Sequence, residues 1–198
     1  ISVSFWMNYT LSDKRLWIMD LGNRTDPVGT TLYWIIGSDG LAQFGVWGNG
    51  DGLNPQYQID FTEYENQWTH VSTVLDNSNK ILKTYLNGEL KSEITYETDL
   101  KLDVLNLTIG QKISDESDFK GTLDEIMIHT KVLSDVEVLD IYENKPTTES
   151  MELHYSFEGE QDVLDCSDEC LECTTTIITC DDSDDTTDDT TDDVLIAY

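Results

Sequence analysis

Short apolar runs separated by turn signals fill the first 130 residues, and this pattern most limits how the chain can fold. The runs are rich in β-branched and aromatic residues, which favour strands. They recur about every 8 to 12 residues without helical patterns between them, as in antiparallel sandwiches. Candidate strands cover residues 2–8, 16–22, 30–37, 41–48, 57–62, 68–75, 80–86, 105–110 and 123–129. We therefore predict an all-β antiparallel sandwich.

Two local motifs add detail to this prediction. Asn87-Gly88 stands between two strand-like runs and is a strong signal for a two-residue hairpin. Ser134 and Glu137 have the spacing of a capping box ahead of an apolar run. We therefore predict one short helix near residues 134–143.

A carboxylate interrupts the apolar side of the strand over residues 123–129. Alternation places Asp124 on the same side as Ile126 and Ile128, and Glu125 on the opposite side, towards solvent. A buried carboxylate without partners would cost several kcal/mol. We therefore expect Asp124 to have hydrogen-bonding or ionic partners.

Size and charge limit the number of domains and the kinds of partner. A chain of 198 residues with 38% hydrophobic content suits one domain and a tail. Its net charge of -29 argues against nucleic acid and anionic lipid surfaces as partners. More than half of that excess lies from Lys145 onward, where 17 acidic residues stand against one basic residue. We expect a sandwich over residues 1–145, an additional strand segment over 146–165 and an acidic tail over 166–198.

Three N-glycosylation sequons begin at Asn8, Asn23 and Asn106. No stretch of about 18 consecutive apolar residues is present, so we expect no membrane span. The chain opens on Ile1 and shows no signal peptide, which leads us to expect a mature or partial chain. Together these features predict an extracellular or cell-surface glycoprotein.

Four cysteines stand at the start of the acidic tail: Cys166, Cys170, Cys173 and Cys180. The first three have the C-x3-C-x2-C spacing of some iron–sulfur ligands. The carboxylates around them and the expected oxidising compartment favour two disulfides instead, with all three connectivities open.

A repeated TTDD unit follows the cysteines and contains Thr186, Thr187, Thr190 and Thr191. It has too few apolar residues to form a core, so we predict an extended thread. The thread is either a solvated acidic linker or an O-glycosylated stalk, and we favour O-glycosylation of these threonines. The apolar residues 194–198 could add a strand to another sheet.

Three long stretches carry a resemblance to a known family: WTHVSTVLDNSNKILKTYLNGEL, LTIG and FKGTLDEIMIHTKVLSDVEVLDIYE. Together they resemble the C-terminal half of a laminin G-like jelly roll of the concanavalin A-like lectin/glucanase superfamily. SVSFWMN resembles the strand that precedes this half in the family, so the resemblance covers residues 1–143. It implies a jelly-roll sandwich and says little about the ligand.

The resemblance gives Asp124 one of two roles. Backbone donors hold it at the sandwich edge, or it contributes to a calcium site, with Asp165 as the weaker second candidate. Calcium is the one cofactor that we consider, and we expect no organic cofactor. The glucanase branch uses a Glu-x-Asp-x-x-Glu strand, but the nearest string, residues 160–165, ends in Asp and lies outside the matched body. We therefore predict no enzyme.

The five tryptophans could stack on sugar rings, as in many lectin-like sandwiches. Most lie inside predicted strands, where aromatic residues are ordinarily core, so we expect packing roles for them. Carbohydrate binding would then use loops whose residues the sequence does not identify.

The run MELHYSFEGE resembles a segment that usually opens such domains, yet it follows the domain here. Residues 151–165 complete either the sandwich of their own chain or that of a neighbour. In the second case, head-to-tail strand exchange builds a fibre. We predict a non-catalytic structural or adhesive glycoprotein that self-assembles into a fibre or array. The alternative is a lectin-like carbohydrate-binding module of a surface or secreted protein.

Overall fold

A computed structural model describes residues 1–22, 30–47, 56–97, 100, 107–110, 118–145, 151–155 and 164–165. The strands are β1 (Ser2–Tyr9), β2 (Leu16–Gly22), β3 (Thr31–Ile36), β4 (Leu41–Trp47), β5 (Gln56–Asp60), β6 (Thr69–Asp76), β7 (Ile81–Leu86), β8 (Glu89–Thr95), β9 (Leu107–Ile109), β10 (Gly121–His129), β11 (Met151–Tyr155) and β12 (Leu164–Asp165). A 3-10 turn spans Thr62–Tyr64, and the helix α1 spans Asp135–Tyr142.

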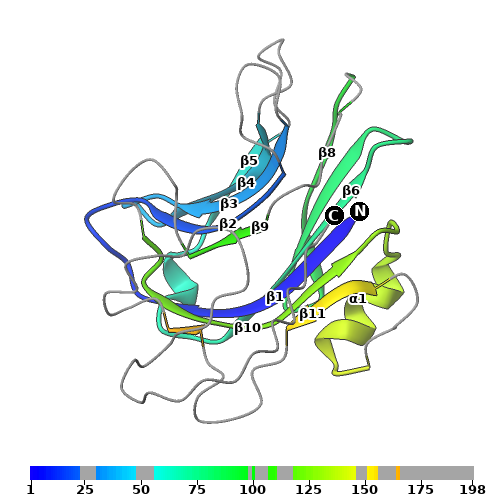
Figure 1. Ribbon diagram of the computed structural model, residues 1–198. Helices are drawn as coiled ribbons and strands as arrows, with labels where there is room; N and C mark the ends of the chain where they lie inside the picture. The colour runs from blue at the N-terminus through cyan, green and yellow to red at the C-terminus, as the bar shows by residue number, and fades with distance from the viewer. Residues whose placement is uncertain are drawn as a thin grey trace, which may run out of the picture.

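Two antiparallel sheets pack face to face. One has the order β11-β10-β1-β6-β7-β8, with β12 also paired to β10, and the other has the order β5-β4-β3-β2-β9. Figure 1 shows that both sheets curve in the same sense, so the outer face of the five-stranded sheet is concave. The prediction of an antiparallel jelly-roll sandwich with one short helix is confirmed.

Alternating apolar residues from both sheets fill the space between them. Val3, Phe5, Met7 and Tyr9 of β1 are fully buried, as period-two alternation requires. The ring of Phe5 meets that of Trp34 edge to face, at 6.0 Å between ring centroids. Both rings belong to the main hydrophobic cluster of the core.

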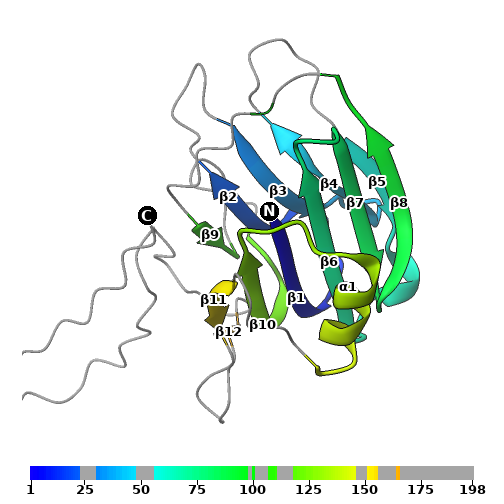
Figure 2. The ribbon, with the colours of Figure 1, turned by 90° about the vertical axis from the view of Figure 1, so that its right-hand side faces the viewer.

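Both local motifs form as predicted. Asn87 and Gly88 have φ angles of 51° and 77°, the paired positive values of a tight hairpin turn between β7 and β8. The Ser134 hydroxyl accepts a hydrogen bond from the Glu137 N–H at 3.3 Å, and Glu137 Oε2 accepts one from the Ser134 N–H at 2.8 Å. This capping box starts α1, which packs on the outer face of the seven-stranded sheet (Figure 2).

Next to α1, three rings form a second packed group on this outer face. His70 of β6 is only 1% exposed, and its ring lies 5.2 Å from that of Trp6 and 5.8 Å from that of Tyr142. Burial lowers the pKa of His70 to about 4. His70 is therefore a neutral packing residue near neutral pH.

The alternation expected for β10 is wrong, because the strand contains a β-bulge. Ser4 pairs with Met127 but Trp6 pairs with Asp124, so two residues of β10 stand opposite Phe5. Glu125 occupies the bulge with a φ of 49°. The bulge moves Asp124 to the outer face beside Trp6, where it is half-buried.

The segment after α1 returns to β10 of the same chain. β11 pairs with the second half of β10, from Ile126 to His129, and β12 pairs with Thr122 and Leu123. Within this single chain, residues 151–155 and 164–165 pair with β10 of their own sheet, and the alternative in which the segment completes a neighbour's sandwich stays a prediction.

Candidate functional site

The outer face of the five-stranded sheet gathers polar and aromatic side chains. In β2, the register shifts at Ile18, and Ile18 and Met19 both face the core. Because of this bulge, Trp17 and Asp20 both lie on the outer face, opposite Ile35 and Tyr33. Across β4 and β5, the register places Gln43, Trp47, Gln56 and Gln58 on the same face.

Two aromatic rings and one aliphatic side chain form a buried floor on one half of this face. Trp17, Tyr33 and Ile35 are 3–4% exposed and make a cluster of their own. The Tyr33 hydroxyl donates to Gln56 Oε1 at 2.5 Å, which holds the exposed amide of Gln56 in place. The floor therefore positions a polar group at the surface.

Among the described residues the buried carboxylate is Asp20, at 6% exposure, and not Asp124. Asp20 Oδ2 accepts from the Trp17 indole N–H at 2.7 Å, and Oδ1 lies 3.4 Å from the Thr31 hydroxyl. These donors offset part of its desolvation. The sequence analysis missed Asp20; the signal was a polar residue inside the apolar run LWIMDLG.

The other half of the face is open to solvent, and we call it the β4–β5 surface. It consists of Gln43, Trp47, Gln56 and Gln58, of which Trp47 is 56% exposed. The packing role expected for the tryptophans holds for Trp34, which is fully buried, but it is wrong for Trp47. An exposed indole beside amide groups offers both an apolar face and hydrogen-bonding groups.

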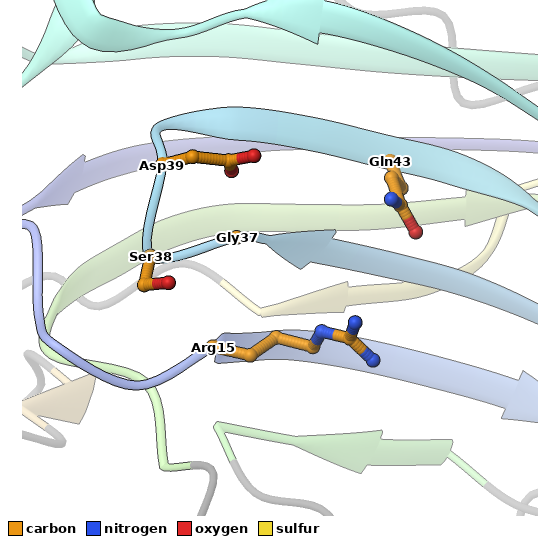
Figure 3. A pocket seen from close by; sticks show the side chains of 5 residues that line it. All are labelled: Arg15, Gly37, Ser38, Asp39 and Gln43. Atoms are coloured by element: carbon orange, nitrogen blue, oxygen red, sulfur yellow. The ribbon is translucent and has the colours of Figure 1, made fainter.

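A polar pocket of about 320 Å³ lies at the other end of β4 from Trp47. We call it the Arg15 pocket; it is lined by Arg15, Gly37, Ser38, Asp39 and Gln43 (Figure 3). Asp39 Oδ1 accepts from the Leu41 N–H at 3.1 Å within the turn that joins β3 to β4. A Cβ on Gly37 would lie 2.4 Å from that oxygen, so a larger residue at this position would displace the Asp39 carboxylate.

Gln43 belongs to both the pocket and the β4–β5 surface. It stands four positions before Trp47 in the same strand, which corresponds to roughly 13 Å at the usual rise per residue. The two features therefore form one continuous elongated surface. The residues of this surface come from the start of β2, the β3–β4 turn, β4 and β5. No single sequence motif therefore predicts it.

The predicted calcium residues are not brought into a cation site in the described part of the chain. Asp124 Oδ1 accepts from the Glu125 N–H at 2.8 Å, a backbone donor as in the first of its two predicted roles. Asp165 stands opposite Thr122 in the sheet, but its side chain lies outside the described residues. Among the described residues, no three His, Cys, Asp or Glu side chains gather as a metal site would need. Calcium binding stays a prediction.

Glu125 was expected to face solvent and is half-buried. Its carboxylate pairs with His154 Nε2 of β11 at 2.5 Å. This contact ties the additional strand segment to the bulge of β10. The pair stands away from the β4–β5 surface, on the other sheet.

The predicted modification sites are only partly covered by the structure. Asn8 lies on the outer face of β1 and is half-buried, and the hydroxyl of Thr10 in the same sequon donates to Asn66 Oδ1 at 2.9 Å. Asn23, Asn106, the four tail threonines and the four cysteines lie outside the described residues. Of the helices in the described ranges, none is long and apolar enough to cross a membrane.

Comparison with known proteins identifies a family and a fold. Residues 1–139 match the family model described as the concanavalin A-like lectin/glucanases superfamily. A comparison with curated proteins gives no match.

Solved structures with this fold include several carbohydrate-binding domains. The binding domain of botulinum neurotoxin serotype D has a TM-score of 0.57 at 23% identity, over 73% of this chain and 36% of the neurotoxin chain. The CBM40 of a Ruminococcus gnavus sialidase has a TM-score of 0.59 at 16% identity, over 71% of this chain and 81% of the module. A pentraxin from Limulus polyphemus has a TM-score of 0.54 at 18% identity, over 71% and 68%. At these identities the likeness concerns the fold.

Proposed function

Because the chain belongs to the concanavalin A-like lectin/glucanases superfamily, we propose that it is a non-catalytic carbohydrate-binding module. In this proposal the sugar lies along the concave outer face of the five-stranded sheet. It spans the β4–β5 surface and the Arg15 pocket. The observation that carries the proposal is the exposure of Trp47 on the same face as three glutamine amides.

The chemistry of this surface suits a sugar. Each hydroxyl of a sugar both donates and accepts hydrogen bonds, and an amide side chain offers both kinds of group at once. The apolar C–H face of the ring needs a flat apolar partner, which the exposed indole of Trp47 supplies. Two of the structural neighbours were solved with sugars bound, the Ruminococcus gnavus module with sialyllactose and the neurotoxin domain with N-acetylneuraminic acid. These cases support a sugar ligand on this fold.

Trp47→Ala tests the proposal. Binding to a panel of immobilised glycans identifies a ligand, and calorimetry then gives its dissociation constant. Removing a central aromatic contact should weaken binding by about tenfold or more. The matched control is Trp68→Ala, because Trp68 is 47% exposed but precedes β6 of the other sheet. Equal losses for both variants, or none for Trp47→Ala, would contradict the assignment of this surface.

We also propose that the protein is an extracellular or cell-surface glycoprotein, on the basis of the sequons and the fold. Asn8 is half-exposed on the outer face of β1, where a glycan would extend away from the core. A mass decrease of the secreted protein on treatment with an N-glycosidase, smaller by one glycan in Asn8→Gln, checks this proposal.

Assembly into a fibre is a separate prediction that stays untested. Because β11 and β12 pair with β10 of the same chain, strand exchange would first require them to leave it. Imaging of the purified protein at native concentration distinguishes fibres from single particles.

A further inference from the structure

We propose that the Arg15 pocket selects a sugar that carries a carboxylate. This inference rests on the proposed function and adds the chemical class of the ligand. It is carried by the position of Arg15 and Gln43 and by the charge around them.

Two hydrogen-bond donors converge on one side of the pocket. Figure 3 shows the guanidinium of Arg15, which extends along β2, and the amide of Gln43, which points towards it from β4. A guanidinium offers a planar fork of N–H groups that matches the two oxygens of a carboxylate. The Gln43 amide can add a further N–H donor.

Asp39 lies at the opposite end of the pocket from these donors (Figure 3). One of its oxygens is engaged by the Leu41 N–H, and an ionised carboxylate can only accept hydrogen bonds. Asp39 and the hydroxyl of Ser38 thus favour a ligand that brings donors, such as sugar hydroxyls, to that end. A ligand with a carboxylate at one end and hydroxyls at the other fits both halves, which a simple organic acid does not.

The charge of Arg15 is available to a ligand. Lys83, Lys91, Lys131 and Lys145 each form an ion pair with a carboxylate. In the described ranges Arg15 forms none, although acidic residues outnumber basic ones by 40 to 11 in the whole chain.

The net charge of -29 makes an Arg15 side chain without an ion pair among the described residues a strong indication of an anion site. The general field of the molecule repels anions, so an anionic sugar is held only where a local cation outweighs that field. A free guanidinium inside a polar pocket is such a place.

Calorimetry with three sugars tests the inference: lactose, 3′-sialyllactose and a glucuronic acid disaccharide. We expect one or both acidic sugars to bind at least tenfold more tightly than lactose. The sugar that binds more tightly shows whether the pocket takes the carboxylate of a sialic acid or that of a uronic acid. Arg15→Ala should weaken the acidic sugar by roughly tenfold to a hundredfold, as for a hydrogen bond to a charged group, and should weaken lactose by a much smaller factor.

Two further variants serve as controls. Arg15→Lys keeps the charge but loses the fork, so it should restore only part of the affinity. Lys91→Ala removes one positive charge from β8, on the other sheet, and should have no effect. Arg15 is exposed, so its replacement should leave thermal unfolding unchanged.

The outcomes separate the two proposals. If lactose binds as tightly as both acidic sugars, the carboxylate inference is overturned while the carbohydrate-binding function stands. If none of a broad panel of glycans binds, the function itself is overturned.

Discussion

A buried hydrogen bond between Trp34 and Thr73 joins the two sheets within the core. The indole N–H of Trp34 in β3 donates to Thr73 Oγ1 in β6 at 2.8 Å, and both residues are fully buried. The Thr73 hydroxyl also lies 3.4 Å from that of Thr84, at the limit of a hydrogen bond. Thr73 is therefore the acceptor on which the buried indole N–H depends.

Thr73→Val preserves the shape of the side chain and removes the acceptor. The indole N–H of Trp34 would then be buried without a partner, which costs about 1–3 kcal/mol of unfolding free energy. For a domain of this size, each kcal/mol lowers Tm by about 2–4 °C, so we expect a fall of roughly 2–12 °C.

Urea unfolding, followed by tryptophan fluorescence and circular dichroism, measures this cost. Thr73→Ser is the matched control, because it keeps the hydroxyl and loses one methyl group, worth about 0.8 kcal/mol before any cavity cost. Thr73→Val should be the more destabilising of the two, with an unchanged m value. A valine variant as stable as the wild type, or more stable than the serine variant, would refute the reasoning.

Two further predictions concern pH and the helix cap. Burial lowers the pKa of His70 from 6.5 to about 4, so its contribution to stability is complete above pH 6.5 and is lost as pH falls towards 4. His70→Leu should flatten the fall of Tm across that interval, and parallel profiles for the two proteins would argue against this. The Lys131 ammonium and the Ser134 cap lower the pKa of Glu137 from 4.5 to about 2. The contribution of ionised Glu137 to stability is therefore complete above pH 4.5 and is lost as pH falls through 2. Ser134→Ala should cost about 1 kcal/mol at neutral pH in chemical unfolding, and Ser134→Asp should recover most of it.

Much of the fold follows from local sequence signals. The hairpin at Asn87-Gly88 and the cap at Ser134 depend on residues that are adjacent or three apart in the chain. Strand positions also depend on short alternating runs, which is why the candidate strands from residues 2–8 to 123–129 match β1 to β10, apart from β8, which the hairpin signal implied. At the hairpin, the helix cap and the strands, the structure that the local sequence favours is the one that the fold contains.

The faces of the strands were harder to predict than their positions. Alternation fails for Asp124 because the bulge at Glu125 adds one residue, and nothing in the string LDEIMIH marks that insertion. Trp47 is different, because alternation opposite the buried Phe44 and Val46 does place it on the outer face with Gln43, and this signal was missed. The Arg15 pocket could not be predicted from local sequence, since its residues meet only when β2 and β4 flank β3.

The bulges in β2 and β10 also decide which side chains enter the interior of the sandwich. In β10, strict alternation would place Asp124 between the sheets and turn Leu123 outwards. In β2, it would place Asp20 between the sheets and turn Met19 outwards. One inserted residue in each strand reverses the parity and prevents both exchanges. Each bulge thus excludes a carboxylate from the apolar interior.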